Sequence, residues 1–412
     1  MTNLAPIPPH WSRVHLSHLS DIPITNGVGE AAQEYVEDSV RYIRTTDIAG
    51  LHHLDDAKMV GLPRDVASAA LVQNGDLLMT AAGSLGTSYL VQLSEPACYA
   101  GYLVRFRAHP ARANARFVAW WTQSRDHLDQ IAVGAVRSTI DNFSAGKFRS
   151  MSVPRPPLEE QRAIADFLDR ETAKIDALIE KQTELIGLLC ERREAVIESA
   201  LESDGPLVAL GYLVECLPGY AFNSEEFSGD EVGVRLLRGI NVKPQSTDWS
   251  DTVYWPEEPA SNLARYRLEV GDIVLGMDRP FIGDGTRVTV IQQTDLPCLL
   301  LQRVLRLRAR PSSSPRFVFH ALMTRSFREY AIPEFTGVSV PHISDKQVRS
   351  WRLRVPDLTT QDQLARRVEA EVSQINSVIA RTEEFIALAK ERRAALITAA
   401  VTGQIDVSGE TS

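Results

Sequence analysis

The sequence predicts an α+β protein in which two globular α/β domains are separated by two long antiparallel helices that pack as a coiled coil, with a pseudo-two-fold internal repeat. Three observations lead to this prediction. Residues 116–201 match residues 316–401 at a constant offset of 200 without a gap. Two proline-free stretches carry apolar residues at helical spacing. Short runs rich in β-branched residues, separated by Gly, Asp, Asn and Pro, fill the rest of each copy.

The repeat is strongest in the second part of each copy. Between residues 147 and 200, 18 of 54 positions are identical to those 200 residues later. Such a long period indicates a duplication of whole domains and not a solenoid. A chain of 412 residues is too long to fold around one hydrophobic core. We therefore divide it into four parts. These are the globular domain 1–157, the long helix 158–203, the globular domain 204–356, and the second long helix with the tail, 357–412.

Each long helix is predicted from its apolar periodicity. The first covers 158–201 and the second 358 to about 401, with apolar residues at three- and four-residue steps. Forty-four residues span roughly 66 Å at about 1.5 Å per residue, which is too long to be buried against one small domain. Two such stripes favour an antiparallel coiled coil. The alternative is that each helix packs on its own domain or on another protein.

The globular domains are predicted to mix strands with one helix each. The expected helices are 115–131 in the first copy and 316–330 in the second. The expected strands of the first copy are 41–48, 76–80, 89–93 and 103–106, and those of the second are 234–240, 272–275, 287–291 and 304–307.

Charge is distributed unevenly along the chain. The net charge of -9 argues against a nucleic-acid binder when the chain is taken as a whole. The balance differs by segment, however. Basic residues (Lys and Arg) number 8 against 3 acidic residues (Asp and Glu) in 101–150, 11 against 5 in 265–328, and 6 against 11 in 158–201. The globular domains thus contain basic stretches and the first helix is acidic. In the second copy, the cations between Arg303 and Arg328 could form a surface that follows DNA phosphates. The alternative is that they only face water.

The sequence gives no support for catalysis. It contains no phosphate-binding GxxxxGK[ST] loop, no dinucleotide-binding glycine motif, no HExxH and no GxSxG. Four widely spaced cysteines form no CxxC, so neither structural zinc nor a disulfide framework is expected, and a reducing cytoplasm fits. No apolar stretch is long enough to cross a membrane, and the N-terminus does not look like a secretory signal.

Several segments resemble the specificity subunits of type I restriction-modification systems. The resemblance covers essentially the whole chain and is carried by PRPPLEEQRAIADFLDRETAKIDALI at 154–179, VPDLTTQDQLARRVEAEVSQINSVI at 355–379, and the helix ends with Glu-Arg-Arg. Weaker similarities are RYIRTTDI at 41–48, RLLRGINV at 235–242, GDLLMTAAGSLG at 75–86 and TGVSVPHIS at 336–344. The first copy departs from the last of these, since AVRSTIDNFS at 135–144 lacks the proline.

The resemblance implies a non-catalytic DNA-recognition subunit. Each globular domain would then be a target recognition domain that reads one half of a split, asymmetric double-stranded DNA target. The helices would set the spacer between the half-sites and dock two modification (methyltransferase) subunits, with restriction subunits joining through the complex. S-adenosylmethionine, ATP and magnesium would be bound by those partners, and no metal by this chain. The alternatives are a coiled-coil scaffold with protein-binding heads and a single-chain restriction-methylation enzyme.

Candidate site residues follow from repeat position and side-chain chemistry. Arginines can donate to guanine or phosphate, and short polar residues in glycine-flanked turns suit groove insertion, although all of these residues could instead form structural ion pairs or turns. The candidate DNA-binding residues are Arg41, Arg44, Thr45, Ser84, Thr87, Arg137, Ser138, Thr139, Lys147, Arg235, Arg238, Asn241, Asp278, Arg279, Thr286, Arg287, Ser339, His342 and Lys346. The candidate partner-binding residues are Ile175, Ile179, Ile186, Ile375, Ile379 and Ile386.

Overall fold

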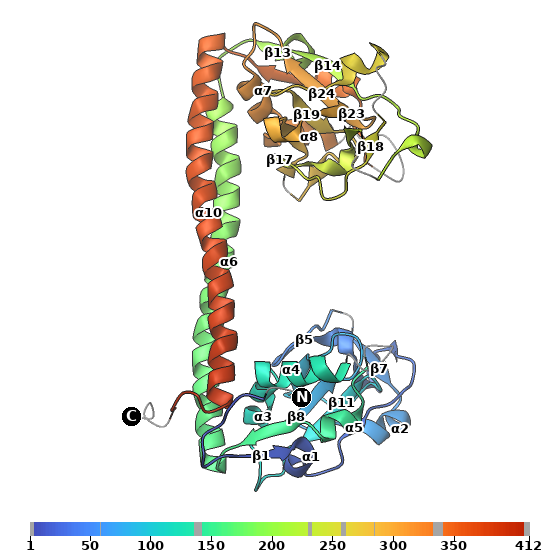
Figure 1. Ribbon diagram of the computed structural model, residues 1–412, viewed down its shortest axis with the longest axis vertical. Coiled ribbons are helices and arrows are strands. Elements are labelled where there is room, and N and C mark those ends of the chain that lie inside the picture. Colours follow the sequence, from blue (N-terminus) through green and yellow to red (C-terminus); the bar gives the residue numbers. More distant parts are fainter. Residues whose placement is uncertain are drawn as a thin grey trace. The chain divides into compact units, whose positions relative to one another are not determined.

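The computed structural model describes residues 4–57, 59–135, 142–229, 233–256, 261–283, 285–332 and 341–407 (Figure 1). The chain forms two compact units. Unit 1 consists of residues 1–183 and 383–412, and unit 2 consists of residues 184–382. Each unit therefore combines one β-rich domain with one part of each long helix.

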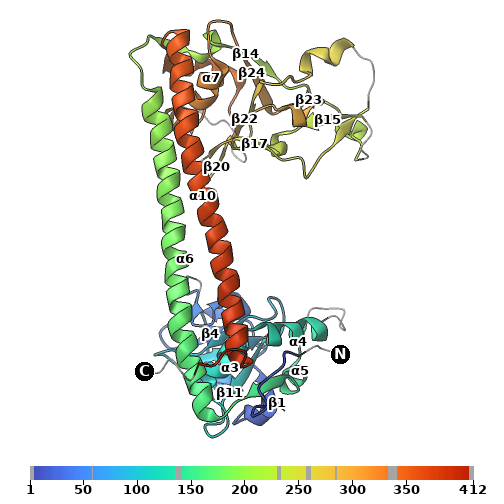
Figure 2. The same ribbon diagram turned by 60° about the vertical axis from the view of Figure 1, so that its left-hand side comes forward.

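The two long helices begin and end where the sequence predicts. Helix α6 spans Leu158–Leu201 and helix α10 spans Leu358–Val401, and they run side by side in opposite directions (Figures 1 and 2). In unit 1, Nε of Arg393 lies 2.8 Å from Oδ1 of Asp176. In unit 2, Arg193 donates to the side-chain oxygen of Asn376 at 3.0 Å. These contacts join equivalent repeat positions, so the antiparallel pairing is confirmed within each unit.

The domain of unit 1 is built around two four-stranded sheets. Their strand orders are β10-β4-β7-β3 and β2-β11-β8-β9, with β1 paired to β12 and β5 to β6. Strands β4 and β10 are parallel. The strands are β1 (Ser12–His15), β2 (Thr25–Asn26), β3 (Gln33–Glu34), β4 (Val40–Ile43), β5 (Ile48–Gly50), β6 (His53–Leu54), β7 (Val60–Leu62), β8 (Asp76–Thr80), β9 (Ser88–Leu90), β10 (Ala97–Tyr99), β11 (Leu103–Arg107) and β12 (Ser152–Arg155). The helices are α1 (Leu16–Leu19), α2 (Arg64–Ala67), α3 (Ala115–Trp121), α4 (Arg125–Ala135) and α5 (Ala145–Arg149).

The domain of unit 2 repeats this plan. Its four-stranded sheet has the order β14-β24-β19-β22, its three-stranded sheet the order β18-β15-β23, and β13 pairs with β25. The strands are β13 (Leu207–Ala209), β14 (Val214–Pro218), β15 (Val234–Leu237), β16 (Val242–Lys243), β17 (Ser246–Thr247), β18 (Tyr254–Trp255), β19 (Ile273–Gly276), β20 (Phe281–Ile282), β21 (Gly285–Thr286), β22 (Val288–Val290), β23 (Cys298–Leu300), β24 (Val304–Ala309) and β25 (Arg352–Arg354). The helices are α7 (Pro315–Ala321), α8 (Arg325–Ala331) and α9 (Asp345–Ser350).

The prediction of one helix in each domain at 115–131 and 316–330 is wrong, because two short helices stand there in both copies. Hydroxyl side chains mark the break. Thr324 accepts a hydrogen bond from the backbone N–H of Phe327 and so caps the start of α8. In unit 1, Ser124 donates to the carbonyl of Trp121 and accepts weakly from the N–H of His127. Such local bonds compete with continuation of the helix.

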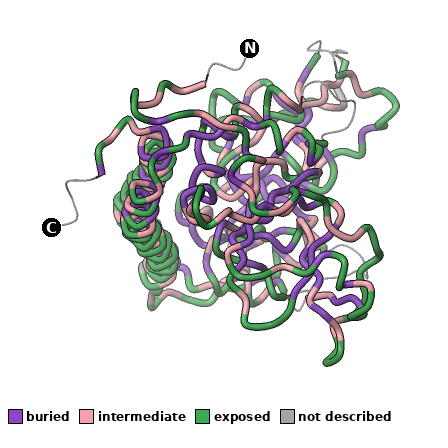
Figure 3. Tube along the Cα trace, turned by 90° about the horizontal axis from the view of Figure 1, so that it is seen from below, coloured by how far each residue is buried: buried purple, intermediate pink, exposed green. Residues whose placement is uncertain are grey.

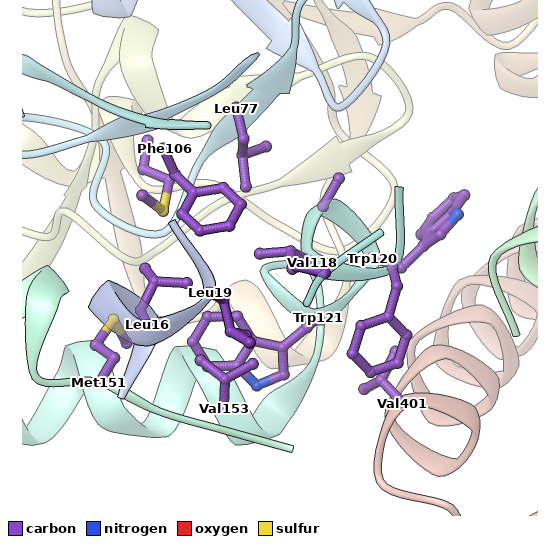
Figure 4. Close-up of a cluster of buried hydrophobic side chains, with 14 of the residues drawn as sticks. Leu16, Leu19, Leu77, Phe106, Val118, Trp120, Trp121, Met151, Val153 and Val401 are labelled. Atoms are coloured by element: carbon purple, nitrogen blue, oxygen red, sulfur yellow. The ribbon is translucent and has the colours of Figure 1, made fainter. Parts of the chain in front are cut away.

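The core of each unit lies between a sheet and the helices. In unit 1, Leu19, Trp121 and Val153 cluster together, and Val401 of α10 closes the side next to the long helices (Figure 4). Unit 2 uses Phe317 and Trp351 together with Ile197 of α6 and further residues of α10. Many residues along α6 and α10 nevertheless remain exposed (Figure 3). Each domain is thus fused to its helix pair by a shared core, while much of the helix surface stays available.

A buried glutamine fastens the start of each long helix. The side chain of Gln161 accepts from the N–H of Asn114 at 2.8 Å and donates to the carbonyl of Pro156 at 3.0 Å. Gln361 accepts from the N–H of Ser314 at 2.9 Å and donates to the carbonyl of Pro356 at 2.9 Å. Both amides are almost fully buried. The glutamine that recurs in both copies therefore fastens the start of each long helix to the domain that precedes it.

Candidate nucleic-acid interface

Three segments of unit 1 meet just beyond the end of β8. The backbone N–H of Ala81 donates to the carbonyl of Tyr102 at 2.8 Å, and the N–H of Phe143 donates to the carbonyl of Ala81 at 2.7 Å. A β-bridge joins Ala82 to Asn142. Phe143 is buried, whereas Tyr102 is 67% exposed. The segments thus hold an exposed aromatic side chain on backbone that is anchored in the core.

Unit 2 contains the same arrangement at the end of β19. The N–H of Met277 donates to the carbonyl of Arg303 at 2.9 Å, and the N–H of Ile343 donates to the carbonyl of Met277 at 3.0 Å. A β-bridge joins Asp278 to His342. We name this arrangement the loop frame. It consists of residues 81–82, 102 and 142–143 in unit 1 and residues 277–278, 303 and 342–343 in unit 2.

The loop frame of unit 2 carries three polar side chains in contact. Nδ1 of His342 lies 2.7 Å from Oδ1 of Asp278, and Nη1 of Arg303 lies 3.8 Å from the same oxygen. Because an ionised carboxylate is an acceptor, Nδ1 of His342 is assigned as the donor. The Arg303 side chain is 58% exposed. Its guanidinium therefore lies near a carboxylate while more than half of the side chain is exposed.

Two residues of this region have a strained backbone. Arg279 has φ of 45° and Arg303 has φ of 72°, which is the left-handed region that favours glycine. Arg279 is exposed, and its N–H donates to the carbonyl of Pro341 at 2.7 Å. Arg279 directly follows Asp278, the residue whose carboxylate lies 3.8 Å from Arg303.

The four arginines expected on the DNA side are all engaged within their own domains. Arg41 forms an ion pair with Asp56. Arg44 pairs with Asp47 at 2.7 Å, a contact that raises the pKa of Arg44. In unit 2, Arg235 donates to the carbonyls of Thr294 and Leu296 and lies over the ring of Trp249, and Arg238 pairs with Asp251 at 2.7 Å. The alternative of structural ion pairing thus describes Arg41, Arg44 and Arg238.

Three other candidates in unit 2 lie inside the domain. Asn241 is 1% exposed and donates to the carbonyls of Asp248 and Asp251. Thr286 is buried in β21. Arg287 is buried and donates to the carbonyls of Val242 and Asp278, and its pKa is lowered by burial. Asn241 and Arg287 thus bond to carbonyls of their own domain, and all three side chains are buried.

The remaining candidates occupy more open positions. Ser84 is exposed, Thr45 and Thr87 are half-buried, and Lys346 of α9 is exposed. Lys147 of α5 donates to the carbonyl of Gly134 at 3.1 Å. Arg137, Ser138, Thr139 and Ser339 lie outside the described residues. Two of the candidates, Asp278 and His342, belong to the loop frame, and their side chains are in contact there.

The arginines of β24 do not form a simple phosphate-tracking row. Arg306 is buried and lies 3.3 Å from Glu215. Arg308 pairs with the buried Asp272 at 2.7 Å, and this contact raises its pKa. Arg107 makes the equivalent pair with Asp76 in unit 1. Sequence reasoning assigned Arg303 to that row and overlooked Tyr102, although both directly precede equivalent strands of the repeat.

The isoleucines predicted to bind partner subunits lie on the less exposed side of the helices. Ile375 is buried, and the other five are half-buried. The exposed apolar side chains of the helices occupy different positions, which repeat at an offset of 200. Apart from Leu358 at the start of α10, they are Leu178, Phe385 and Leu388 in unit 1 and Leu185, Leu188 and Val378 in unit 2. We name each set of three the apolar patch of its unit.

The described residues provide no cluster of three or more His, Cys, Asp or Glu side chains that could hold a metal ion. Burial raises the pKa of Cys98 to about 11 and that of the equivalent Cys298 to about 12, which disfavours reactive thiolates. Among the helices within the described ranges, none combines the length and apolarity that a membrane span requires.

The fold and the duplicated loop frame define a protein of two similar modules, each of which joins a β-rich domain to a helix pair. The family model of the type I restriction modification DNA specificity domain matches residues 10–186. The specificity subunit of the type I restriction enzyme EcoAI from Escherichia coli is 29% identical over 267 residues, which cover 63% of this chain and 44% of that protein. The MjaVIII specificity subunit from Methanocaldococcus jannaschii is 26% identical over 276 residues, which cover 63% of each chain. The matches thus span about half to two thirds of these relatives.

Solved structures share the fold over nearly the whole chain. A chain from a structure of complex assembly and conformational transition in the type I R-M system has a TM-score of 0.71 at 17% identity and covers 97% of this chain and 100% of its own. The HsdS subunit from Thermoanaerobacter tengcongensis has a TM-score of 0.51 at 19% identity, with 98% and 100% covered. The chain thus matches the type I restriction modification DNA specificity domain over residues 10–186 and shares the fold of these solved structures over nearly its whole length.

Proposed function

We propose that this chain is the DNA-recognition subunit of a type I restriction-modification complex, and that each unit reads one half of a bipartite, asymmetric double-stranded target. The loop frame is the observation that carries the proposal. Its backbone hydrogen bonds are the same in both units, but its side chains differ: Ala82, Tyr102 and Asn142 in unit 1, and Asp278, Arg303 and His342 in unit 2. One backbone with two sets of donors and acceptors suits two different base sequences.

The helices would hold the recognition domains apart and dock two modification subunits. One apolar patch is present in each unit at equivalent repeat positions. An exposed leucine by itself is ordinary, but three large apolar side chains on one helix pair favour a protein-protein contact. Two equivalent patches therefore favour two modification subunits per chain. The half-buried isoleucines would support these patches from within the helix pair.

The chemistry would belong to the partner subunits. S-adenosylmethionine, ATP and magnesium are expected on the modification and restriction subunits, the latter joining through the complex. The work of the chain would take place in the cytoplasm, where the DNA lies.

Methylome sequencing tests the proposal. Cells that express the chain with its modification subunits should methylate one bipartite motif, and cells without the chain should not. Exchanging residues 204–356 for the matching domain of a relative should change one half-site and leave the other intact. A change in both half-sites would contradict independent readers. If wild-type cells show no chain-dependent motif, the chain is a scaffold instead.

A further inference from the structure

We propose that Arg303 is the side chain with which unit 2 recognises a guanine, and that Tyr102 holds the same reading position in unit 1. The inference rests on the proposed function and deepens it, because it assigns specificity to one residue in each half of the repeat.

The two residues occupy the same place in the backbone. The N–H of Leu103 donates to the carbonyl of Ala100 at 2.9 Å, and the N–H of Val304 donates to the carbonyl of Leu301 at 3.2 Å. Tyr102 and Arg303 are thus the third residues of four-residue turns that lead into β11 and β24, and of the two only Arg303 has a positive φ. Each carbonyl also accepts the bond that closes the loop frame, so the side chain starts from a fixed point.

Both positions combine exposure with rigidity. Tyr102 and Arg303 project from turns whose next residues, Leu103 and Val304, are fully buried at the start of central strands. A side chain that reads a base must reach into a groove from a backbone that does not move. The arginines of β24 itself do not meet this condition, because Arg306 and Arg308 pair with Glu215 and Asp272.

The charges around Arg303 favour a base edge over a phosphate. Asp278 lies 3.8 Å from its guanidinium, and an anionic neighbour repels a phosphate group at that point. Guanine instead offers two neutral acceptors, O6 and N7, which match the fork of an arginine. His342 donates to Asp278 at 2.7 Å and keeps this carboxylate beside Arg303. Asp278 is therefore a positioning residue for the guanidinium.

The backbone conformation supports the same assignment. A turn that needs positive φ at its third residue is satisfied at least cost by glycine, and Arg303 has φ of 72° there. Strained residues of this kind occur mainly where function requires the side chain. Arg279, the residue after Asp278, also has a positive φ, of 45°.

The first experiment compares methylomes of cells that express the full chain, as wild type or as a variant, with its modification subunits. Arg303→Ala should relax one guanine position in one half-site, which would increase the number of methylated sites about fourfold. Tyr102→Ala should relax the other half-site only, and Asp278→Ala the same position as Arg303→Ala. The matched control is Arg354→Ala, an exposed arginine of β25 outside the loop frame, which should leave the motif unchanged.

The second experiment uses the assembled complex and duplexes in which 7-deazaguanine replaces the relaxed guanine. Loss of N7 should weaken wild-type binding about tenfold and Arg303→Ala binding hardly at all. An Arg303→Ala motif identical to that of wild type, or uniform weakening on every sequence, would overturn the assignment and indicate no contact or a phosphate contact. The wild-type motif must be present in these cells, so failure of the inference is distinguishable from failure of the proposed function.

Discussion

The imidazole of His127 packs against the indole of Trp121 in the core of unit 1, with ring centroids 4.8 Å apart and planes at 69°. In unit 2 the equivalent residue is Phe327, which packs against Trp351 at 4.9 Å and 66°. The tryptophans come from different positions of the repeat, so the two units build the same kind of aromatic contact from different residues. A group that titrates in unit 1 is replaced by one that does not in unit 2.

This difference predicts an acid sensitivity in unit 1. Burial lowers the pKa of His127 to about 4, from 6.5. The unfolded chain therefore binds this proton at higher pH than the folded chain does, and the stability due to the neutral ring, complete above pH 6.5, is lost as pH falls toward 4. Calorimetry should show that the free energy of unfolding of His127→Phe falls by roughly 3 kcal/mol less than that of the wild type as the pH is lowered. The exposed His10→Phe is the control, and an unchanged pH profile for His127→Phe would contradict the argument.

We expect Gln361→Ala to destabilise unit 2 by about 1–3 kcal/mol, because the N–H of Ser314 and the carbonyl of Pro356 would lose their partner inside the protein. Chemical denaturation of the variant measures the loss. Gln363→Ala, two residues further along α10 at an exposed position, should change stability by less than about 0.5 kcal/mol. Equal effects of the two substitutions would show that the buried bonds do not matter.

Arg107→Ala should lower the stability of unit 1 by about 3 kcal/mol, because it leaves the fully buried carboxylate of Asp76 without its ion partner. The recognised base sequence should not change, since this pair acts within the domain. Thermal unfolding and methylome sequencing together check both parts. Arg112→Ala, at an exposed position nearby, serves as the control, and a relaxed half-site in Arg107→Ala would show that Arg107 reads DNA directly.

If the apolar patches bind modification subunits, charged side chains introduced there should prevent that binding. Leu188 and Leu388 are more than half exposed, so Leu188→Asp with Leu388→Asp should leave the melting temperature of the chain nearly unchanged. Copurification of modification subunits should fall at least about tenfold, because a carboxylate would be buried in the contact. Leu207→Asp, equally exposed on β13, is the matched control. Undiminished copurification would show that the subunits dock elsewhere.

If the helices set the distance between the half-sites, longer helices should lengthen the spacer of the DNA target. Insertion of four residues after Glu180 in α6 and after Ala380 in α10 lengthens each helix by one turn, about 6 Å. The unspecified spacer of the methylated motif should grow by about one or two base pairs, at roughly 3.4 Å each, with both half-sites unchanged. Methylome sequencing reads this directly. Methylation at the original spacing with full efficiency would mean that the helices only brace the domains.

The repeat, the bounds of both long helices and the resemblance to specificity subunits are predictable from the sequence, because they depend on local periodicity and on residues that recur at a constant offset. Strands such as β8, at Asp76–Thr80, are predictable for the same reason. The division of each expected short helix into two was missed, since it depends on hydroxyl groups of Ser124 and Thr324 that compete with the backbone.

Only the tertiary structure reveals the loop frame and the residues that belong to it. Arg44, Asn241 and Arg287 looked as suitable for DNA as Arg303 did, because a sequence shows a donor but not the acceptor that folding brings beside it. In the folded chain, Arg44 faces Asp47, Asn241 is buried, and Arg287 donates to carbonyls of its own domain. Arg303 and Tyr102 stand out because residues far apart in the chain meet around them, and long-range hydrogen bonds fix their backbone while leaving their side chains exposed.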